Sequence, residues 1–106
     1  MIITTTEQVP GFVAKKYLGL VWSSTVRSKH IGWDIQAMLK SLAGGEIPAY
    51  KRMLNEARDE VLKGLAANAK KLKANAVVGV KFEITQIMPT MVEVVAYGTA
   101  VSLQKA

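Results

Sequence analysis

The sequence lacks cysteine altogether and contains a single histidine, His30. The absence of cysteine excludes disulfide bridges, thiolate metal sites, catalytic thiols and iron–sulfur clusters. Long apolar runs are also missing, since no stretch approaches the ~20 residues that a membrane-spanning helix needs. Residues 1–7 carry neither a basic side chain nor a long apolar segment, so we expect no signal peptide. We therefore expect a cytoplasmic protein with no membrane partner.

Apolar residues, by contrast, are abundant. Of the 106 residues, 50% are hydrophobic and only 21% are charged. A chain of this length forms one domain, covering residues 1–106, and buries about 65% of its surface in one modest core. Because so apolar a chain exceeds what that core needs, we expect part of its surface to meet another chain. The net charge of +6 favours an anionic partner such as nucleic acid, but it is not specific for one.

Residues 12–26, after the turn signal Pro10-Gly11, have the composition of a β-strand. Strict alternation divides this strand into two faces, one of which is mixed in polarity. The other face is more apolar and carries Phe12, Ala14, Leu18, Leu20, Trp22 and Val26, with Lys16 as the exception.

Two helices are predicted next. Residues 27–43 repeat apolar side chains at steps of three and four, with Ser28 as the candidate N-cap and Gly44-Gly45 as the stop. Residues 46–73 form the second helix, in which Pro48 suits the first turn. At roughly 42 Å this helix exceeds a compact body of about 35 Å, so we expect it to bend near Gly64 or to lean on a neighbouring chain. Its apolar stripe is Tyr50, Met53, Leu54, Ala57, Val61, Leu65, Ala69 and Leu72.

Residues 75–87 and 91–103 predict an antiparallel hairpin around Pro89-Thr90. The predicted fold is α+β: a two-layer sandwich of order β-α-α-β-β, with helices on one face of a three-stranded antiparallel sheet. Both faces of the last strand are largely apolar, so the uncovered face favours assembly into an oligomer. One face of the 75–87 strand is expected to hold Ala76, Val78, Val80, Phe82 and Ile84, and Gly79 and Gly98 are expected to admit a close neighbour.

Several sequence blocks together resemble the YbjQ-like family over essentially the whole chain. These blocks are Gly44-Gly45-Glu46-Ile47 with Tyr50, residues 74–82 (Ala-Asn-Ala-Val-Val-Gly-Val-Lys-Phe), and residues 96–101 (Ala-Tyr-Gly-Thr-Ala-Val). The resemblance implies a small α/β subunit that assembles into a homopentameric ring. It also implies the family's heavy-metal-binding label, but neither an established activity nor a motif of metal ligands.

Metal binding and hydrolysis have few candidate residues. His30 and Asp34 are four residues apart, but two ligands do not make a zinc site unless ring symmetry repeats them. Ser23, Ser24 and Thr25 are possible nucleophiles, yet His30 is the single imidazole available as a base and no nucleophile-elbow motif is present. The sequence therefore predicts no catalytic residues, and it assigns no metal ligands.

Anion binding has weak candidates as well. Gly44-Gly45 precedes a helix start, where phosphate can bind, although Glu46 already places a negative charge there. Basic side chains gather at Lys63, Lys70, Lys71 and Lys73 and at Lys15-Lys16, without the aromatic residues typical of nucleic-acid binding. Glu56, Asp59 and Glu60 lie among basic residues and predict a solvated helix face.

The sequence thus predicts a homo-oligomer of unknown function, a pentamer by family resemblance. Its expected role is binding or scaffolding, with no cofactor and no visible catalytic centre. Two alternatives remain open: metal binding through symmetric non-thiolate ligands, and electrostatic binding of nucleic acid.

Overall fold

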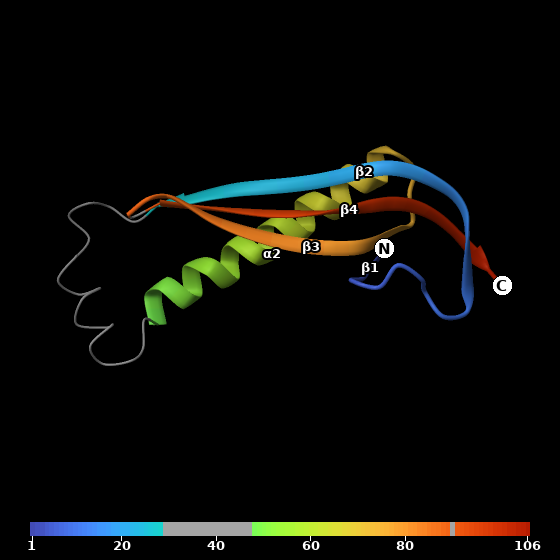
Figure 1. Ribbon diagram of the computed structural model, residues 1–106, viewed down its shortest axis with the longest axis horizontal. Coiled ribbons are helices and arrows are strands. Elements are labelled where there is room, and N and C mark those ends of the chain that lie inside the picture. Colours follow the sequence, from blue (N-terminus) through green and yellow to red (C-terminus); the bar gives the residue numbers. More distant parts are fainter. Residues whose placement is uncertain (29–47, 90) are drawn as a thin grey trace.

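The computed structural model describes residues 1–28, 48–89 and 91–106, which form two layers. Helix α2 lies on one face of a four-stranded sheet of order β1-β3-β4-β2, as Figure 1 shows. The predicted α+β arrangement, with helix on one face of the sheet, is therefore confirmed. The elements are β1 (Ile2–Ile3), β2 (Phe12–Ser28), α2 (Pro48–Lys71), β3 (Ala76–Met88) and β4 (Met91–Lys105).

The prediction of a three-stranded antiparallel sheet was wrong, because β1 adds a short parallel strand beside β3. Backbone hydrogen bonds hold it there: the Ile2 amide donates to the Asn75 carbonyl and the Thr4 amide to the Val77 carbonyl. A strand of two residues has no side-chain period, so its sequence gives no signal. The β2–β4 and β3–β4 pairs are antiparallel, as predicted.

The predicted helix start at residue 27 was wrong. Arg27 and Ser28 extend β2 and pair with Val92 and Met91 of β4. The rest of that helix lies outside the described residues, together with His30 and Gly44-Gly45. Among the residues described, the structure contains no helix that is both long and apolar enough to cross a membrane.

Helix α2 begins with Pro48 in the first turn, as predicted, and ends two residues earlier than predicted. Lys73 adopts a left-handed conformation with φ of 65°, and the Ala74 amide donates to the Ala69 carbonyl over 3.1 Å. The Lys73 amide donates to the Lys70 carbonyl over 2.9 Å, which completes a Schellman-type C-cap. Five residues of the predicted stripe are buried: Met53, Ala57, Val61, Leu65 and Ala69.

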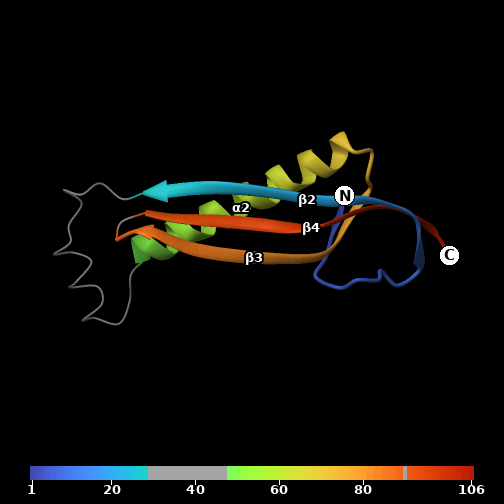
Figure 2. The ribbon, with the colours of Figure 1, turned by 45° about the horizontal axis from the view of Figure 1, so that its top comes forward.

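The expectation of a compact body was wrong, because the molecule measures 55 × 23 × 16 Å. Long strands make the molecule elongated. Helix α2 therefore continues through Gly64, and its length fits within the longest dimension of the molecule. Figure 2 shows that α2 crosses the sheet diagonally, and its last turns extend past β2. Gly64 serves close packing instead, because a Cβ there would lie 3.2 Å from the Cβ of Ser23.

The main core lies between α2 and the sheet. Its fully buried side chains come from the helix stripe, from Val77 of β3 and from alternate positions of β4. Gly98 of β4 admits β3 closely, as predicted, because a Cβ there would lie 2.9 Å from the Val78 carbonyl oxygen. No atom lies within 4 Å of a Cβ placed on Gly79, so that glycine is needed for its φ of +62° rather than for space.

Bulges at two glycines decide which side chains face the helix. Beside Gly79 the β3–β4 register shifts, so Ala76 and Val78 lie on one face while Val80 packs into the core on the other. The predicted single face of residues 76, 78, 80, 82 and 84 is therefore wrong. Gly19, with φ of +106°, lies at a second shift that brings both Leu18 and Val21 to the helix side.

Candidate functional site

The sheet face opposite α2, called the outer face below, exposes large apolar side chains on β2. Leu20, Trp22 and Val26 of the strand face that is more apolar in sequence are exposed there. The predicted faces do not hold along the whole strand, because Leu18 of that face packs against the core, while the mixed face supplies both the exposed Tyr17 and the buried Val21. Monomeric proteins rarely leave such a row uncovered. The exposed fractions along the row are 68% for Tyr17, 71% for Leu20, 58% for Trp22 and 51% for Val26.

Tyr97 occupies the centre of the outer face, where it pairs with Trp22 on β2 and with Lys81 on β3. Its hydroxyl donates to Oε1 of Glu83 over 3.2 Å. Partial desolvation on the sheet and this carboxylate acceptor both favour the neutral phenol, and they raise the pKa of Tyr97 above its ordinary value. The centre of the outer face thus combines aromatic rings with one charge of each sign.

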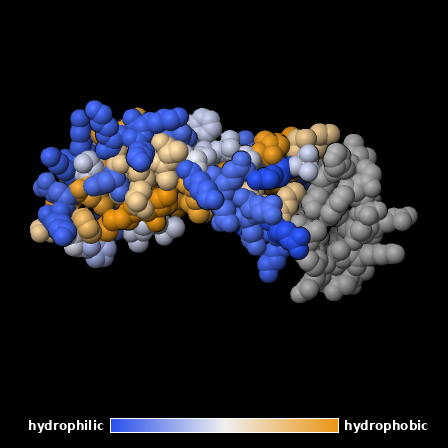
Figure 3. Space-filling view, turned by 180° about the vertical axis from the view of Figure 1, so that it is seen from behind, coloured by the Kyte–Doolittle hydropathy of each residue, from blue (hydrophilic) through white to orange (hydrophobic). Residues whose placement is uncertain are grey.

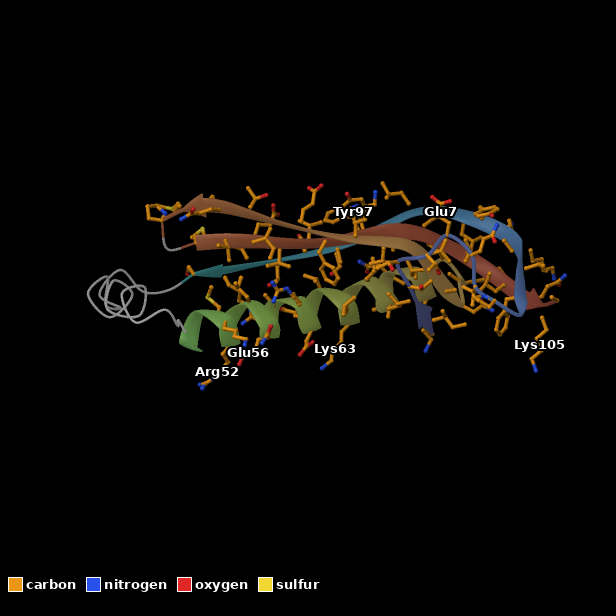
Figure 4. All side chains as sticks on the ribbon, turned by 60° about the horizontal axis from the view of Figure 1, so that its bottom comes forward. Glu7, Arg52, Glu56, Lys63, Tyr97 and Lys105 are labelled. Carbon is orange, nitrogen blue, oxygen red and sulfur yellow. The ribbon has the colours of Figure 1, made fainter. Side chains whose placement is uncertain are left out.

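The N-terminal segment borders two open hollows on the outer face. One has a volume of about 480 Å³ and reaches Val9, Tyr17 and Val101. The other, of about 430 Å³, reaches Lys81 and Tyr97, and both hollows share Glu7, Tyr17 and Val78. In Figure 4, Glu7 and Tyr97 lie on the side of the sheet away from α2. Aromatic, apolar and charged side chains line the two hollows together.

Glu60 of α2 links the helix to β2. Its Oε2 accepts hydrogen bonds from Thr25 Oγ1 at 2.9 Å and from Arg27 Nη2 at 2.5 Å. These two bonds, with the positive charge of Arg27, lower the pKa of Glu60 below its ordinary value. The sequence did not indicate this cluster, because 35 residues separate Thr25 from Glu60. The prediction of a solvated face is confirmed, because Glu56, Asp59 and Glu60 are all exposed.

The three candidate hydroxyls do not converge. Ser23 packs beneath Gly64 and Thr25 donates to Glu60, so both lie on the helix side. Ser24 is exposed on the other face, opposite Val95. The one candidate base, His30, lies outside the described residues.

The donor set does not suit a heavy metal ion in a single chain. Residues 1–28, 48–89 and 91–106 contain no group of three histidine, cysteine, aspartate or glutamate side chains that could hold one. Soft metals need thiolates or several imidazoles, and the full sequence offers no cysteine and one histidine. The pair His30 and Asp34 lies outside the described residues, as does the phosphate candidate Gly44-Gly45.

Basic side chains gather at the C-terminal end of α2. Lys70 and Lys71 lie in its last turn, where they complement the negative end of the helix dipole, as expected. Figure 4 shows Lys63 pointing away from the sheet, and in Figure 3 hydrophilic side chains gather over α2 with hydrophobic side chains visible beside them. The basic candidates Lys15 and Lys16 are exposed at the first β2 bulge.

A third hollow lies where α2 extends past β2. It has a volume of about 560 Å³, and its lining includes Leu20, Trp22, Asn68, Lys71 and Leu72. Asn68 Nδ2 donates to the Trp22 carbonyl over 2.8 Å, which links the C-terminal part of α2 to β2. Leu72 is 41% exposed although it belongs to the predicted apolar stripe. Just after the end of α2, the chain therefore presents a partly exposed apolar side chain beside this hollow.

Comparison with known proteins places the chain among uncharacterised relatives. The family model YbjQ_1, described as "Putative heavy-metal-binding", matches residues 1–104. A "UPF0145 protein" of Thermotoga petrophila is 52% identical over 105 residues, and one of Dehalococcoides mccartyi strain BAV1 is 51% identical over 104; at least 98% of each chain is covered.

A solved structure has the same fold. It is described as a protein of unknown function of the DUF74 family from Pediococcus pentosaceus. It aligns with a TM-score of 0.62 at 18% identity and covers 98% of both chains. At that identity the likeness concerns the fold alone.

Proposed function

Because this chain belongs to the YbjQ family, we propose that it works in the cytoplasm as a homo-oligomeric ring of five copies, with a binding or scaffolding role and no catalytic centre. The observation that carries the proposal is the uncovered apolar row on β2. Leu20 and Trp22 are 71% and 58% exposed at the middle of a long strand. Protein interfaces are where large aromatic and aliphatic side chains of this kind become buried.

The energetics support association. Full burial of one large apolar side chain contributes about 1.5–3 kcal/mol, so the row on β2 holds enough to offset much of the entropy lost on association. A long sheet with open edges and an uncovered apolar face is also prone to aggregate unless a specific partner covers it. A second copy of the chain is the partner that is always present.

Native mass spectrometry and light scattering at micromolar concentration test the proposal. The expected particle contains five copies of the 11.5 kDa chain. Trp22→Lys places a charge in the apolar row and is expected to shift the mass toward the monomer. The matched control Val13→Lys changes an apolar side chain of the same strand, 45% exposed, outside that row. A wild-type protein that stays monomeric would overturn the proposal.

Neither alternative has a site in the described residues that favours it. Metal binding would need ligands repeated by the ring, because one chain offers too few soft donors. Nucleic-acid binding would rest on the lysines at the end of α2 and would weaken steeply as salt rises. Titration of a fluorescent oligonucleotide at low and high salt tests that alternative, and no binding at low salt would remove it.

A further inference from the structure

We propose that neighbouring copies join through unlike edges of their sheets: the open edge of β2 in one copy pairs with the open edge of β3 in the next. The inference rests on the proposed homo-oligomer and specifies its interface. In the described chain, β2 and β3 each have one long side that pairs with β4 and another that no strand covers over most of its length.

The open edge of β3 runs from Lys81 to Met88. Before it, the N-terminal segment occupies the edge, because the Gly79 and Val80 amides donate to the carbonyls of Thr6 and Thr4. Eight residues of strand span roughly 26 Å. The opposite edge belongs to β2, which is 17 residues long. Both edges are therefore long enough to form a ladder of backbone hydrogen bonds.

The helix layer is offset in a way that complements these edges. Val80 faces α2, and alternation places Phe82 and Ile84 on the same side. They remain 40% and 44% exposed, because α2 packs on β2 and β4 and scarcely touches β3. At the other edge the last turns of α2 extend past β2, as Figure 2 shows, and leave an open hollow beside Leu72.

A neighbouring β3 placed beside β2 would bring its uncovered apolar side chains beneath that overhang. Within one copy, Ser23 of β2, Ala96 of β4 and Phe82 of β3 form one row across the sheet. A sheet that continues in register from copy to copy therefore places the neighbour's Phe82 close to Ser23 and Asn68. The β3 edge is not covered by α2, whereas α2 extends beyond the β2 edge, so the two edges are complementary.

The area favours a ring over a two-fold dimer. An edge of roughly 26 Å, multiplied by the 16 Å short dimension of the molecule, covers about 400 Å² per copy. That is half of the ~800 Å² per partner in a standard stable interface. A dimer of like edges would use one such edge and leave the other open. A ring of unlike edges uses both edges of every copy and closes.

The relative direction of β2 and β3 across the interface follows from their directions within one copy. Strands β2 and β3 are both antiparallel to β4, so they are parallel to each other. Rotation about an axis along the strands preserves this direction, and the β2–β3 pairing between copies is therefore parallel. Pairing of like edges about a two-fold axis would instead be antiparallel.

Disulfide trapping tests the interface cleanly, because the chain has no cysteine of its own. Ser24→Cys is combined in turn with Lys81→Cys, Glu83→Cys and Thr85→Cys, since pairing through Tyr97, Val95 and Glu93 places these three positions on the outer face. Within one copy β4 separates residue 24 from β3, so their Cα atoms lie two strand spacings apart, about 10 Å, beyond the ~7 Å that a disulfide spans. Any disulfide must therefore join two copies.

Mild oxidation of at least one double variant is expected to give a ladder of covalent multimers that ends at the mass of the closed ring. Each single-cysteine variant is expected to stay monomeric on a non-reducing gel. The control pair Ser24→Cys and Asp59→Cys, with the second position on the exposed face of α2, is expected to show no ladder.

Two results would overturn the inference while leaving the oligomer intact. Dimers from a single-cysteine variant would show that like edges pair. Absence of a ladder in all three double variants, with native mass spectrometry still finding a multimer, would show that another surface joins the copies. A monomeric wild type would instead overturn the proposed function.

Discussion

Gly64 of α2 packs against Ser23 of β2 so closely that a Cβ on Gly64 would lie 3.2 Å from the Ser23 Cβ and would overlap its hydroxyl oxygen. This contact sets the distance between the helix layer and β2. Both residues lie where the diagonal helix passes over the strand, between the Glu60 cluster and the Asn68 contact with the Trp22 carbonyl.

We expect Gly64→Ala to destabilise the protein by about 1–2 kcal/mol. Overpacking of this kind costs about 1–3 kcal/mol, and the better helix propensity of alanine returns up to about 1 kcal/mol. Urea unfolding measures the change. In the background of Ser23→Gly, which removes the obstructing side chain, the same substitution should be neutral or stabilising. A simple sum of the two single effects would show that the contact is not the cause.

The glycines of the β3–β4 pair are expected to respond differently to asparagine. Gly98→Asn places a Cβ 2.9 Å from the Val78 carbonyl oxygen. Because a backbone atom in a paired strand cannot move away easily, we expect the protein to lose more than about 2 kcal/mol of stability. Gly79→Asn has open space and a φ of +62° that asparagine tolerates, so the loss should stay below about 1 kcal/mol. Thermal unfolding of both variants checks the order. A reversed order would contradict the bulge at Gly79.

Lys73→Gly is expected to stabilise the protein by about 1 kcal/mol. Lysine at this C-cap holds a left-handed conformation with φ of 65°, which costs a residue with a Cβ roughly 1–2 kcal/mol, whereas glycine adopts it freely. Denaturant unfolding at high salt separates this backbone effect from the lost charge. Lys70→Gly, inside the last helical turn, serves as the control and should destabilise.

Glu60 should make stability depend on pH on the acid side. Its pKa is lowered in the folded state by Thr25 and Arg27, so its contribution is present above the unfolded value of 4.5 and is lost as the pH falls through the lower folded value. Glu60→Gln removes this contribution. Wild-type stability is therefore expected to fall more steeply below pH 4.5 than that of the variant. Parallel curves would mean that the cluster does not persist in solution.

Calorimetric titration with Zn²⁺, Cu²⁺ and Ni²⁺ checks the family's metal label. The donor chemistry leads us to expect no tight binding of one ion per chain. The comparison variant is His30→Ala, which should give the same trace as the wild type. Stoichiometric heat that disappears in this variant would instead favour a symmetric site repeated around the ring.

Several features followed directly from the sequence, because they are local. The period of three and four residues from Met53 to Ala69 specifies a helix with one buried face. Alternation in β4 specifies which of its residues pack in the core, and Pro48 marks the first turn of α2. The high apolar content indicated that the core of so small a domain cannot bury every large apolar side chain, and several of them are exposed.

The tertiary structure decided what depends on distant segments. Bulges at Gly19 and Gly79 reverse the alternation along β2 and β3, and a strict period of two cannot predict such reversals. The link from Glu60 to Thr25 and Arg27 joins residues more than thirty positions apart. Long strands also made the body elongated, so the helix that seemed too long for its domain fits along the sheet. Composition thus determined that apolar surface remains, whereas the register of the strands decided that it lies on the outer face and along the two open edges.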